Sequence, residues 1–508
     1  MECIITIEIG TGAIRVTAFD MNGNLIGSSK GSYPTFHARP SFSEQDPEQI
    51  FITMLYKLKN FLNEEIHPKK YNVVCICFSS AMHSVLPIDK SGVPLGNAIV
   101  WSDNRAKKEA DELKNSKLGK ELYNATGTPI HAMSPLNKIT WLRENDKDRF
   151  AATRKFLSIK TYIIQQLTGE YVVDHSVASA TGMLNIYTLQ WEDNALRHAG
   201  INKEELADIV PVSYSQQKLK KEYQTSLGLN DKVKIIVGSS DGCMATLGAG
   251  VWGDGKATVT IEESGAIRVI GKEVVQDEKQ RLFNYVLSEG NYVSGGPTNN
   301  AGSAFEWYVT QFGDFKEAFD VEDCMENLIN DASKVSVGSD GLIFLPYLQG
   351  ERAPIWNANA RGAYFGLNIK HQQRHFIRAT IEGIIYAFYS IGKTLEDHRT
   401  IKSLSANGTF ASYPFWLQIM ADIFNKPVYI KQNSGPDSVA CGGYLLSATE
   451  LGMYKNLEEA AQKTKLTDGF HPKQQHHSIY QKHFAIFESL STKLFDEFEA
   501  IAELQRNN

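Results

Sequence analysis

The chain has 508 residues, of which 42% are hydrophobic and 22% are charged, and its formal net charge is −6. This length predicts two or three domains that each bury a full core, and the composition excludes disordered, collagen-like and fibrous proteins. Because 58 Asp and Glu residues outnumber 52 Lys and Arg residues, the chain has no basic surplus for binding nucleic acid or anionic membranes by bulk charge.

The six cysteines form no Cys-x-x-Cys pair, so a zinc ribbon or a thioredoxin-type redox site is not expected. The N-terminus lacks a basic region followed by an apolar core, and no apolar run approaches the ~20 residues that a membrane helix needs. We therefore expect a soluble, cytoplasmic protein.

The first residues predict a strand, a turn and further strands. Residues 3–9 are apolar and β-branched, Gly10-Thr-Gly12 interrupts them, and residues 14–20 resume strand character. The following Asn22-Gly23 is typical of a tight hairpin, which makes residues 25–28 the returning strand.

A helix and a buried strand come next. Asp46 is suited to cap a helix that has Pro47 at its first position, and apolar residues recur at helical spacing through Phe61. Residues 73–78 form a near-continuous apolar run, which is typical of a buried strand in a mixed α/β sheet.

A similar arrangement recurs half a chain length later, where residues 258–262 and 266–271 predict two strands around a break. The pentapeptide Gly12-Ala-Ile-Arg-Val16 reappears there as Gly265-Ala-Ile-Arg-Val269. Such a short match can arise by chance, but together with the repeated strand-turn-strand pattern it suggests two related α/β domains. We place their boundary in the glycine-rich residues 246–256. Further helices are predicted at residues 376–396, 458–463 and 480–506.

The Gly-Thr-Gly turn has the chemistry of a phosphate site. Its backbone N–H groups are not shielded by Cβ atoms, Thr11 adds a hydroxyl donor, and Glu8 could hold a phosphate-bound Mg²⁺ through water. The alternative is an ordinary hairpin turn. A second such turn at residues 263–265 favours the phosphate interpretation, because two hairpins can clamp a triphosphate.

Asp241 lies between small residues at the end of the apolar strand predicted at residues 233–237. An aspartate there can accept a proton from a substrate hydroxyl that attacks a phosphorus atom. The alternative is that Asp241 only caps the following helix.

Two long motifs carry a resemblance to a known family. They are Met133-Ser-Pro-Leu-Asn-Lys-Ile-Thr-Trp-Leu-Arg-Glu-Asn145, and Gly362-Ala-Tyr-Phe-Gly-Leu367 followed seven residues later by His375-Phe-Ile-Arg-Ala-Thr-Ile-Glu382. On these motifs the chain resembles the FGGY carbohydrate kinases over essentially its whole length. The resemblance implies an α/β fold of two actin-like ATPase (ribonuclease H-like) domains with a cleft between them. Residues 1–248 would hold the sugar and the catalytic base, and residues 249–508 would hold the nucleotide.

Within that family the chain is most similar to gluconate kinases, and xylulose kinases share its Met-His pair and its Trp-x-Asp-x-Arg run. The resemblance implies that Asp241 is the catalytic base and that Arg105 can pair with a substrate carboxylate. For His83 the alternative is a buried, satisfied histidine. The residues implied to line the sugar site are Met82, His83, Trp101, Asp103 and Arg105.

The resemblance also implies nucleotide-binding residues, with Glu8 on the metal. These are Gly10, Thr11, Arg15, Ser264, Gly265, Gly302, Glu306, Gly408 and Ser412. The chain departs from the family pattern on this side only: Gly12 and Ala13 replace two hydroxyl residues, Glu262 and Glu263 replace Gly-Thr, and Asn407 replaces a glycine.

These features predict an ATP- and Mg²⁺-dependent kinase that phosphorylates a terminal hydroxyl of gluconate. One alternative is a xylulose (ketose) kinase of the same family. Another, from a different class, is a sugar-binding protein whose nucleotide site is disabled. The expected partners are a sugar or sugar acid and ATP, with no nucleic acid and no membrane, and a homodimer is left open.

Overall fold

The computed structural model describes every residue except 217, 313–320, 433–436, 468 and 508. The chain divides into two compact units. The first comprises residues 1–248, 271–294 and 437–463, and the second comprises residues 249–270, 295–436 and 464–508.

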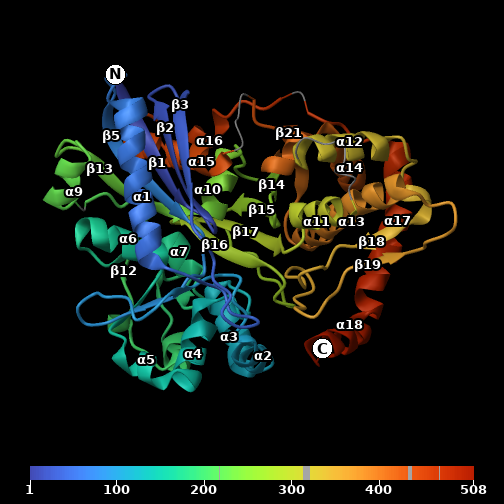
Figure 1. Ribbon diagram of the computed structural model, residues 1–508, viewed down its shortest axis with the longest axis horizontal. Helices are drawn as coiled ribbons and strands as arrows, with labels where there is room; N and C mark the ends of the chain where they lie inside the picture. Colours follow the sequence, from blue (N-terminus) through green and yellow to red (C-terminus); the bar gives the residue numbers. More distant parts are fainter. Residues whose placement is uncertain (217, 313–320, 433–436, 468, 508) are drawn as a thin grey trace. The chain divides into compact units, whose positions relative to one another are not determined.

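A five-stranded mixed sheet in the order β13-β5-β1-β2-β3 forms the centre of the first unit (Figure 1). β13 and β1 both run parallel to β5, whereas β2 is antiparallel to both β1 and β3. Side chains on both faces of β1 are buried, so the sheet is covered on both sides. The strands are β1 (Glu2–Ile9), β2 (Ala13–Asp20), β3 (Leu25–Ser32), β5 (Asn72–Ser80) and β13 (Lys234–Ser240).

The strands and the first helix predicted for this region are confirmed, although the returning strand of the hairpin runs on to Ser32. Helix α1 (Pro47–Phe61) begins as its sequence predicts. The Asp46 carboxylate accepts the N–H groups of Glu48 and Gln49 at 2.9 and 3.1 Å, and so caps the helix.

Short paired strands and further helices complete the first unit. The strand pairs are β4 (Glu44–Gln45) with β7 (Ala98–Ile99), β6 (Leu86–Ile88) with β8 (Lys155–Leu157), β9 (Val172–Asp174) with β12 (Asp208–Val210), and β10 (Leu184–Asn185) with β11 (Gln190–Trp191). The helices are α2 (Lys107–Lys114), α3 (Lys117–Thr126), α4 (Pro135–Asn145), α5 (Lys147–Ala152), α6 (Ile159–Thr168), α7 (His175–Ser179), α8 (Asp193–Ala199), α9 (Lys221–Ser226), α10 (Asp241–Gly248), α15 (Ser438–Glu450) and α16 (Leu457–Gln462).

Two segments from the second half of the chain belong to the first unit, whereas the sequence predicted two consecutive domains, 1–248 and 249–508. β16 (Phe283–Ser288) is held there by the Val286 N–H, which donates to Ser179 Oγ at 3.1 Å. α15 packs against α10, β1 and β5, and Figure 1 shows it beside β1. The packing of α15 on α10 is so close that a Cβ atom on Gly442 would lie 2.1 Å from the Met244 carbonyl oxygen. These long-range contacts, rather than chain order, define the unit.

The sheet of the second unit contains the strands β15-β14-β20-β21 in this order, and β17 continues it on the other side of β15. β14 is antiparallel to β15 and parallel to β20, as β1 is antiparallel to β2 and parallel to β5. The two copies of the repeated pentapeptide therefore end on equivalent strands, β2 and β15, in agreement with two related domains. The strands are β14 (Gly255–Ile261), β15 (Gly265–Gly271), β20 (Ile401–Asn407) and β21 (Val428–Ile430), with β17 (Asn291–Thr298) passing from the first unit into the second.

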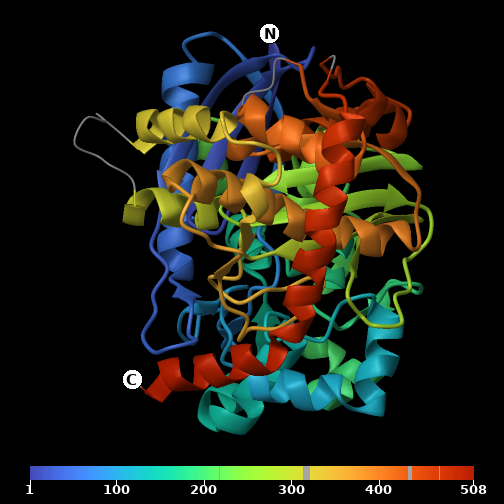
Figure 2. The ribbon, with the colours of Figure 1, turned by 90° about the vertical axis from the view of Figure 1, so that its right-hand side faces the viewer.

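The remaining elements of the second unit are mostly helical. They are the strand pair β18 (Ile343–Leu345) and β19 (Ala363–Phe365), and the helices α11 (Gly302–Phe312), α12 (Val321–Ser333), α13 (Gln373–Glu396), α14 (Pro414–Phe424), α17 (Gln474–Lys493) and α18 (Phe495–Asn507). The single tail helix predicted over residues 480–506 is wrong in one respect. The chain turns at Leu494, and Figure 2 shows α17 and α18 meeting at an angle. None of the described helices is long and apolar enough to cross a membrane.

Candidate active site

Three predicted functional segments leave the first unit's sheet at the same edge. β1, β5 and β13 are parallel neighbours, and Ser80 of β5 pairs with both Ile9 of β1 and Ser240 of β13. The residues that follow these strand ends are the Gly10–Gly12 turn, the segment with Met82 and His83, and Asp241. Ligands of open α/β sheets bind at the carboxyl ends of parallel strands, so this edge is the candidate active site.

Hydrogen bonds to backbone groups of the Gly10–Gly12 turn fix its conformation. Gly10 N–H donates to Ala13 O at 2.9 Å, and Tyr33 N–H donates to Gly12 O at 3.1 Å. The Tyr33 hydroxyl also donates to Gly10 O, and Gln45 Nε2 donates to Thr11 O. The carbonyl groups of the turn are thus bound within the protein, which gives the turn a fixed shape.

Trp101 connects the two predicted binding regions of the first unit. Its indole Nε1–H donates to the Thr11 hydroxyl at 2.9 Å. The sequence predicts that Trp101 lines the sugar site and that Thr11 binds phosphate. The structure therefore brings these two residues together, while both roles stay predictions.

Asp103 is fully buried and its carboxylate is saturated with donors. Oδ1 accepts the backbone N–H and the Nε–H of Arg105 at 3.0 and 2.9 Å. Oδ2 accepts the Ser43 N–H and Arg105 Nη2–H at 2.6 and 2.7 Å. A carboxylate has about four acceptor positions, and these four bonds fill them. The structure favours a role in which Asp103 holds Arg105, and its direct contact with a sugar stays a prediction.

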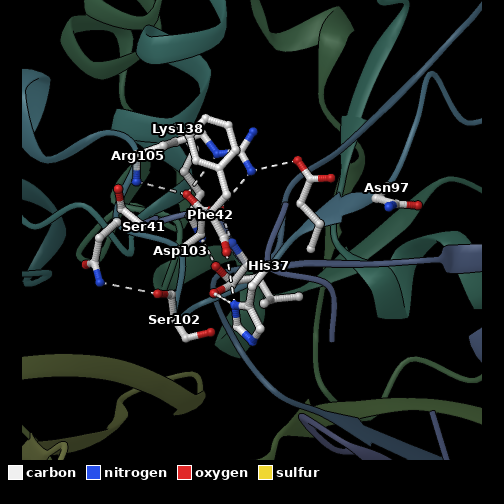
Figure 3. A network of polar contacts seen from close by, with 12 residues as sticks. His37, Ser41, Phe42, Asn97, Ser102, Asp103, Arg105 and Lys138 are labelled. Atoms are coloured by element: carbon white, nitrogen blue, oxygen red, sulfur yellow. Dashed lines mark hydrogen bonds and ion pairs between the residues drawn. The ribbon is translucent and has the colours of Figure 1, made fainter. Parts of the chain in front are cut away.

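The Arg105 guanidinium is held on several sides, with its side chain only 2% exposed. Nη2 also donates to Glu44 Oε1 at 2.6 Å, and the guanidinium carbon lies 3.8 Å from the centre of the Phe42 ring. Figure 3 shows this network, with Phe42 beside Asp103 and Arg105. Nη1 makes no hydrogen bond to the residues that the structure describes, so it is the group that a substrate carboxylate would use. The predicted pairing stays a prediction.

His83 is buried, and both of its ring nitrogens make hydrogen bonds. Nδ1 lies 2.8 Å from Ala180 O, and since a carbonyl only accepts, Nδ1 carries the proton. Nε2 lies 3.3 Å from the Tyr285 hydroxyl oxygen, a contact that engages the second ring nitrogen. Met82 beside it is half-buried. The sequence alternative of a satisfied histidine therefore describes the side chain in this structure, and sugar contact by Met82 and His83 stays a prediction.

Asp241 is the first residue of α10 and is half-buried. Its Oδ1 accepts the Gly242 N–H at 2.6 Å, and a helix N-terminus is a favourable place for a negative charge. The strand end before it is fixed by Lys160, whose Nζ lies 2.9 Å from Ser239 O and 2.8 Å from Asp174 Oδ2. The structure thus places a carboxylate on a rigid strand-to-helix junction at the candidate site.

Glu8 and Arg15 face each other across the β1-β2 hairpin. Arg15 Nη1 lies 3.6 Å from Glu8 Oε2 and 3.1 Å from Asp437 Oδ2. The described residues contain no group of three or more His, Cys, Asp or Glu side chains that could hold a metal ion. A kinase Mg²⁺ is bound by one or two carboxylates and the substrate phosphates, so Glu8 fits such an ion without a protein cage.

The predicted nucleotide residues of the second unit lie around the β14-β15 turn. Gly302 N–H donates to Glu262 O at 2.8 Å, and Ser303 N–H donates to Glu263 O at 3.0 Å. The turn carbonyls therefore cap α11. The structure brings the turn residues Ser264 and Gly265 together with Gly302, but the Gly302 N–H is already occupied.

Glu262 joins this turn to the loop that contains Gly408 and Ser412. Its Oε1 accepts the Thr409 N–H at 3.1 Å and its Oε2 accepts the Thr409 hydroxyl at 2.8 Å. Gly408 has a φ of +94°, and a Cβ there would lie 2.4 Å from Ile261 O, so glycine is required. Ser412 donates to Thr409 O at 2.7 Å. One of the two unexpected glutamates thus holds two predicted nucleotide segments together.

The same region is acidic. Burial and the charges of Glu263 and Glu262 raise the pKa of the Glu306 carboxyl. Asn407, the third departure from the family pattern, donates to the Thr258 hydroxyl at 2.7 Å. Binding of a triphosphate here requires cations to offset the acidic groups.

Sequence reasoning missed several residues that organise the first unit's site: Glu44, Gln45, Lys138, Lys160 and Tyr285. Lys138 lies inside the first family motif, and Glu44 and Gln45 directly precede the helix cap Asp46, but nothing local shows which groups they bind. Their partners are distant in sequence.

Comparison with known proteins identifies the family of this chain. The N-terminal domain of the FGGY family of carbohydrate kinases matches residues 3–248, and its C-terminal domain matches residues 264–451. The fold is thus that of a carbohydrate kinase. The chain belongs to the FGGY family.

Its relatives include gluconokinases and xylulose kinases. A gluconokinase from Bacillus subtilis is 36% identical over 508 residues, covering 99% of this chain and 98% of the relative. A solved gluconate kinase from Lactobacillus acidophilus has a TM-score of 0.91 and 32% identity, and covers 98% of this chain and 99% of its own. A ligand-bound xylulose kinase from the same organism has a TM-score of 0.92 and 31% identity, with 99% and 100% coverage.

Proposed function

We propose that this protein is an ATP-dependent gluconate kinase that transfers the γ-phosphoryl group of ATP to a terminal hydroxyl of gluconate. One observation carries the proposal: Asp241, the Gly10–Gly12 turn and the Met82–His83 segment all follow the carboxyl ends of neighbouring parallel strands. The similarity to gluconokinases over the full chain supports gluconate as the acceptor.

In the proposed reaction the Asp241 carboxylate takes the proton of the attacking hydroxyl. The hydroxyl oxygen bonds to the γ-phosphorus as the bond to the bridging oxygen breaks, and ADP leaves with that oxygen. General-base assistance of this kind contributes roughly 10²–10⁴ in rate. Mg²⁺ held near Glu8 would offset charge on the phosphates, and Arg105 Nη1 would pair with the gluconate carboxylate.

We place the reaction in the cytoplasm. Cys3, Cys75 and Cys77 are buried free thiols, as is usual in a reducing compartment. Burial raises the pKa of each of these thiols to about 12, which makes them unreactive.

A xylulose kinase is the second candidate, because a B. subtilis xylulose kinase is 28% identical over the full chain and Arg105 is largely engaged by Asp103 and Glu44. The third candidate is a sugar-binding protein with a disabled nucleotide site. It is favoured by the acidic group around Glu262, Glu263 and Glu306.

The test is ADP release from Mg-ATP with gluconate, xylulose, glycerol or no sugar, for the wild type and Asp241→Asn. We expect gluconate-dependent ADP that falls at least 100-fold in the variant. Turnover with xylulose alone would show that xylulose, not gluconate, is the substrate, and the proposed mechanism would still hold. Sugar binding without turnover of any sugar would support the disabled binding protein.

A further inference from the structure

The Lys138 side chain is a buried ammonium group whose partners are backbone carbonyls. Lys138 lies in the first turn of α4 and is 0% exposed. Its Nζ donates to His83 O and to Val100 O, both at 2.7 Å. Among the residues that the structure describes, Lys138 forms no ion pair, and its hydrogen bonds go to these two carbonyls.

An uncompensated ammonium is an unfavourable group for a protein interior. Burial lowers the pKa of Lys138 to about 7, although the charge of Asp103 opposes this effect. Methionine would fill a similar volume without a charge. What lysine adds at this position is therefore its N–H donors, and the two carbonyls that they bind point to its role.

The first carbonyl belongs to a strained backbone. His83 has a φ of +68°, a left-handed conformation that side-chain-bearing residues seldom adopt. Such conformations persist where surrounding contacts fix them. Lys138 fixes the carbonyl of His83, while Ala180 and Tyr285 fix its ring.

The second carbonyl opens the loop with the Trp-x-Asp-x-Arg run. Val100 O also accepts the Asp103 N–H at 3.1 Å, which closes a turn that contains Trp101. One nitrogen atom thus joins the loop after β5 to the loop after β7, and these two loops carry all five predicted sugar-site residues. Figure 3 shows Lys138 beside Asp103 and Arg105.

We propose that Lys138 is the positioning residue of the sugar site, whose Nζ sets the spacing and orientation of the His83 and Val100 loops. The proposal rests on the proposed sugar kinase function. It assigns Lys138 no contact with the sugar or with ATP. Its loss should therefore weaken sugar binding and leave ATP binding in place.

The test uses Lys138→Met, which removes the donors, and Lys138→Gln, which keeps an N–H donor without the charge. Lys155→Met is the matched control, because Lys155 Nζ also donates to two carbonyls in the same unit, those of Glu204 and Leu206, at 3.1 and 2.7 Å. KM for sugar and for ATP are measured with the sugar that the wild type phosphorylates, and calorimetry gives the Kd for that sugar.

We expect Lys138→Met to raise the sugar KM and Kd at least about tenfold, corresponding to the loss of the two hydrogen bonds that Nζ donates. The KM for ATP should stay within about twofold, and Lys138→Gln should recover part of the loss. The control should match the wild type in both constants.

An unchanged sugar KM in Lys138→Met, or an equal rise in both KM values, would overturn the positioning role. If Lys138→Met does not fold, the same comparison of the sugar KM with the ATP KM is made on Lys138→Gln. A wild type that neither binds nor phosphorylates gluconate, xylulose or glycerol would instead overturn the proposed function, and the inference with it.

Discussion

Replacing Asp103 by Asn tests how the sugar loop is held. The change keeps the shape of the side chain but removes its charge, and it turns one acceptor into a donor. At the Oδ2 position that donor would face the Ser43 N–H and the Arg105 Nη2–H, which bond there at 2.6 and 2.7 Å. At the Oδ1 position it would face the backbone N–H and the Nε–H of Arg105 instead. The buried guanidinium of Arg105 also loses one of its two carboxylates.

The expected loss of unfolding free energy depends on the burial of the pair: the Asp103 and Arg105 side chains are 0% and 2% exposed. Removing one partner of a buried pair lowers the free energy of unfolding by about 3–5 kcal/mol. Glu44 remains 2.6 Å from Arg105, so we expect a loss at the lower end, about 3 kcal/mol. A displaced loop should also raise the KM for gluconate.

The assay is urea unfolding followed by tryptophan fluorescence, with Asp111→Asn as the control. Asp111 forms an exposed pair with Lys107 on α2, for which a loss of at most about 0.5 kcal/mol is expected. If Asp103→Asn loses less than about 1 kcal/mol of stability but its gluconate KM rises strongly, Asp103 contacts the sugar itself and the positioning argument is refuted.

Three further predictions concern the other contacts. Trp101→Phe keeps an aromatic ring but loses the hydrogen bond to the Thr11 hydroxyl, so the KM for ATP should rise about fivefold in the ADP-release assay. An unchanged KM for ATP would show that Trp101 does not support phosphate binding by the turn. Thr409→Val removes a donor to Glu262 Oε2, and the same assay should show about a fivefold rise in the KM for ATP with the gluconate KM unchanged. Burial lowers the pKa of Lys138 in the folded protein to about 7, against an ordinary lysine value of 10.5. Between these two values the unfolded chain binds more protons, so the free energy of unfolding rises with pH. From pH 7 to 8.5 the free energy of unfolding of the wild type should therefore rise by between about 1 and 2 kcal/mol relative to Lys138→Met in urea titrations. An equal pH dependence for both proteins would contradict the lowered pKa.

Features encoded over a few neighbouring residues could be predicted from the sequence. The cap at Asp46, the hairpin at Asn22-Gly23 and the buried strand at residues 73–78 each depend on local chemistry, and the structure confirms them. The placement of Asp241 at the end of β13 follows in the same way from an apolar run that ends in small residues.

Contacts between distant residues could not be predicted. Lys138 lies 55 residues from His83 and 38 from Val100, and Tyr285 lies 202 residues from His83. A sequence pattern shows that Asp103 and Arg105 are polar residues near a strand, but their burial depends on Phe42 and Glu44 folding over them. Motif resemblance names such positions without showing that their hydrogen-bonding capacity is already used.

The place of α15 in the first unit also has a consequence for synthesis on the ribosome. A nascent chain that has emerged only to Gly248 has made α10, β1 and β5 but not the helix that covers them. The surface that receives Gly442 and its neighbours stays open to water and to chaperones until residues 437–463 have left the exit tunnel. The first unit thus begins to form early but is completed only after most of the second unit has been translated.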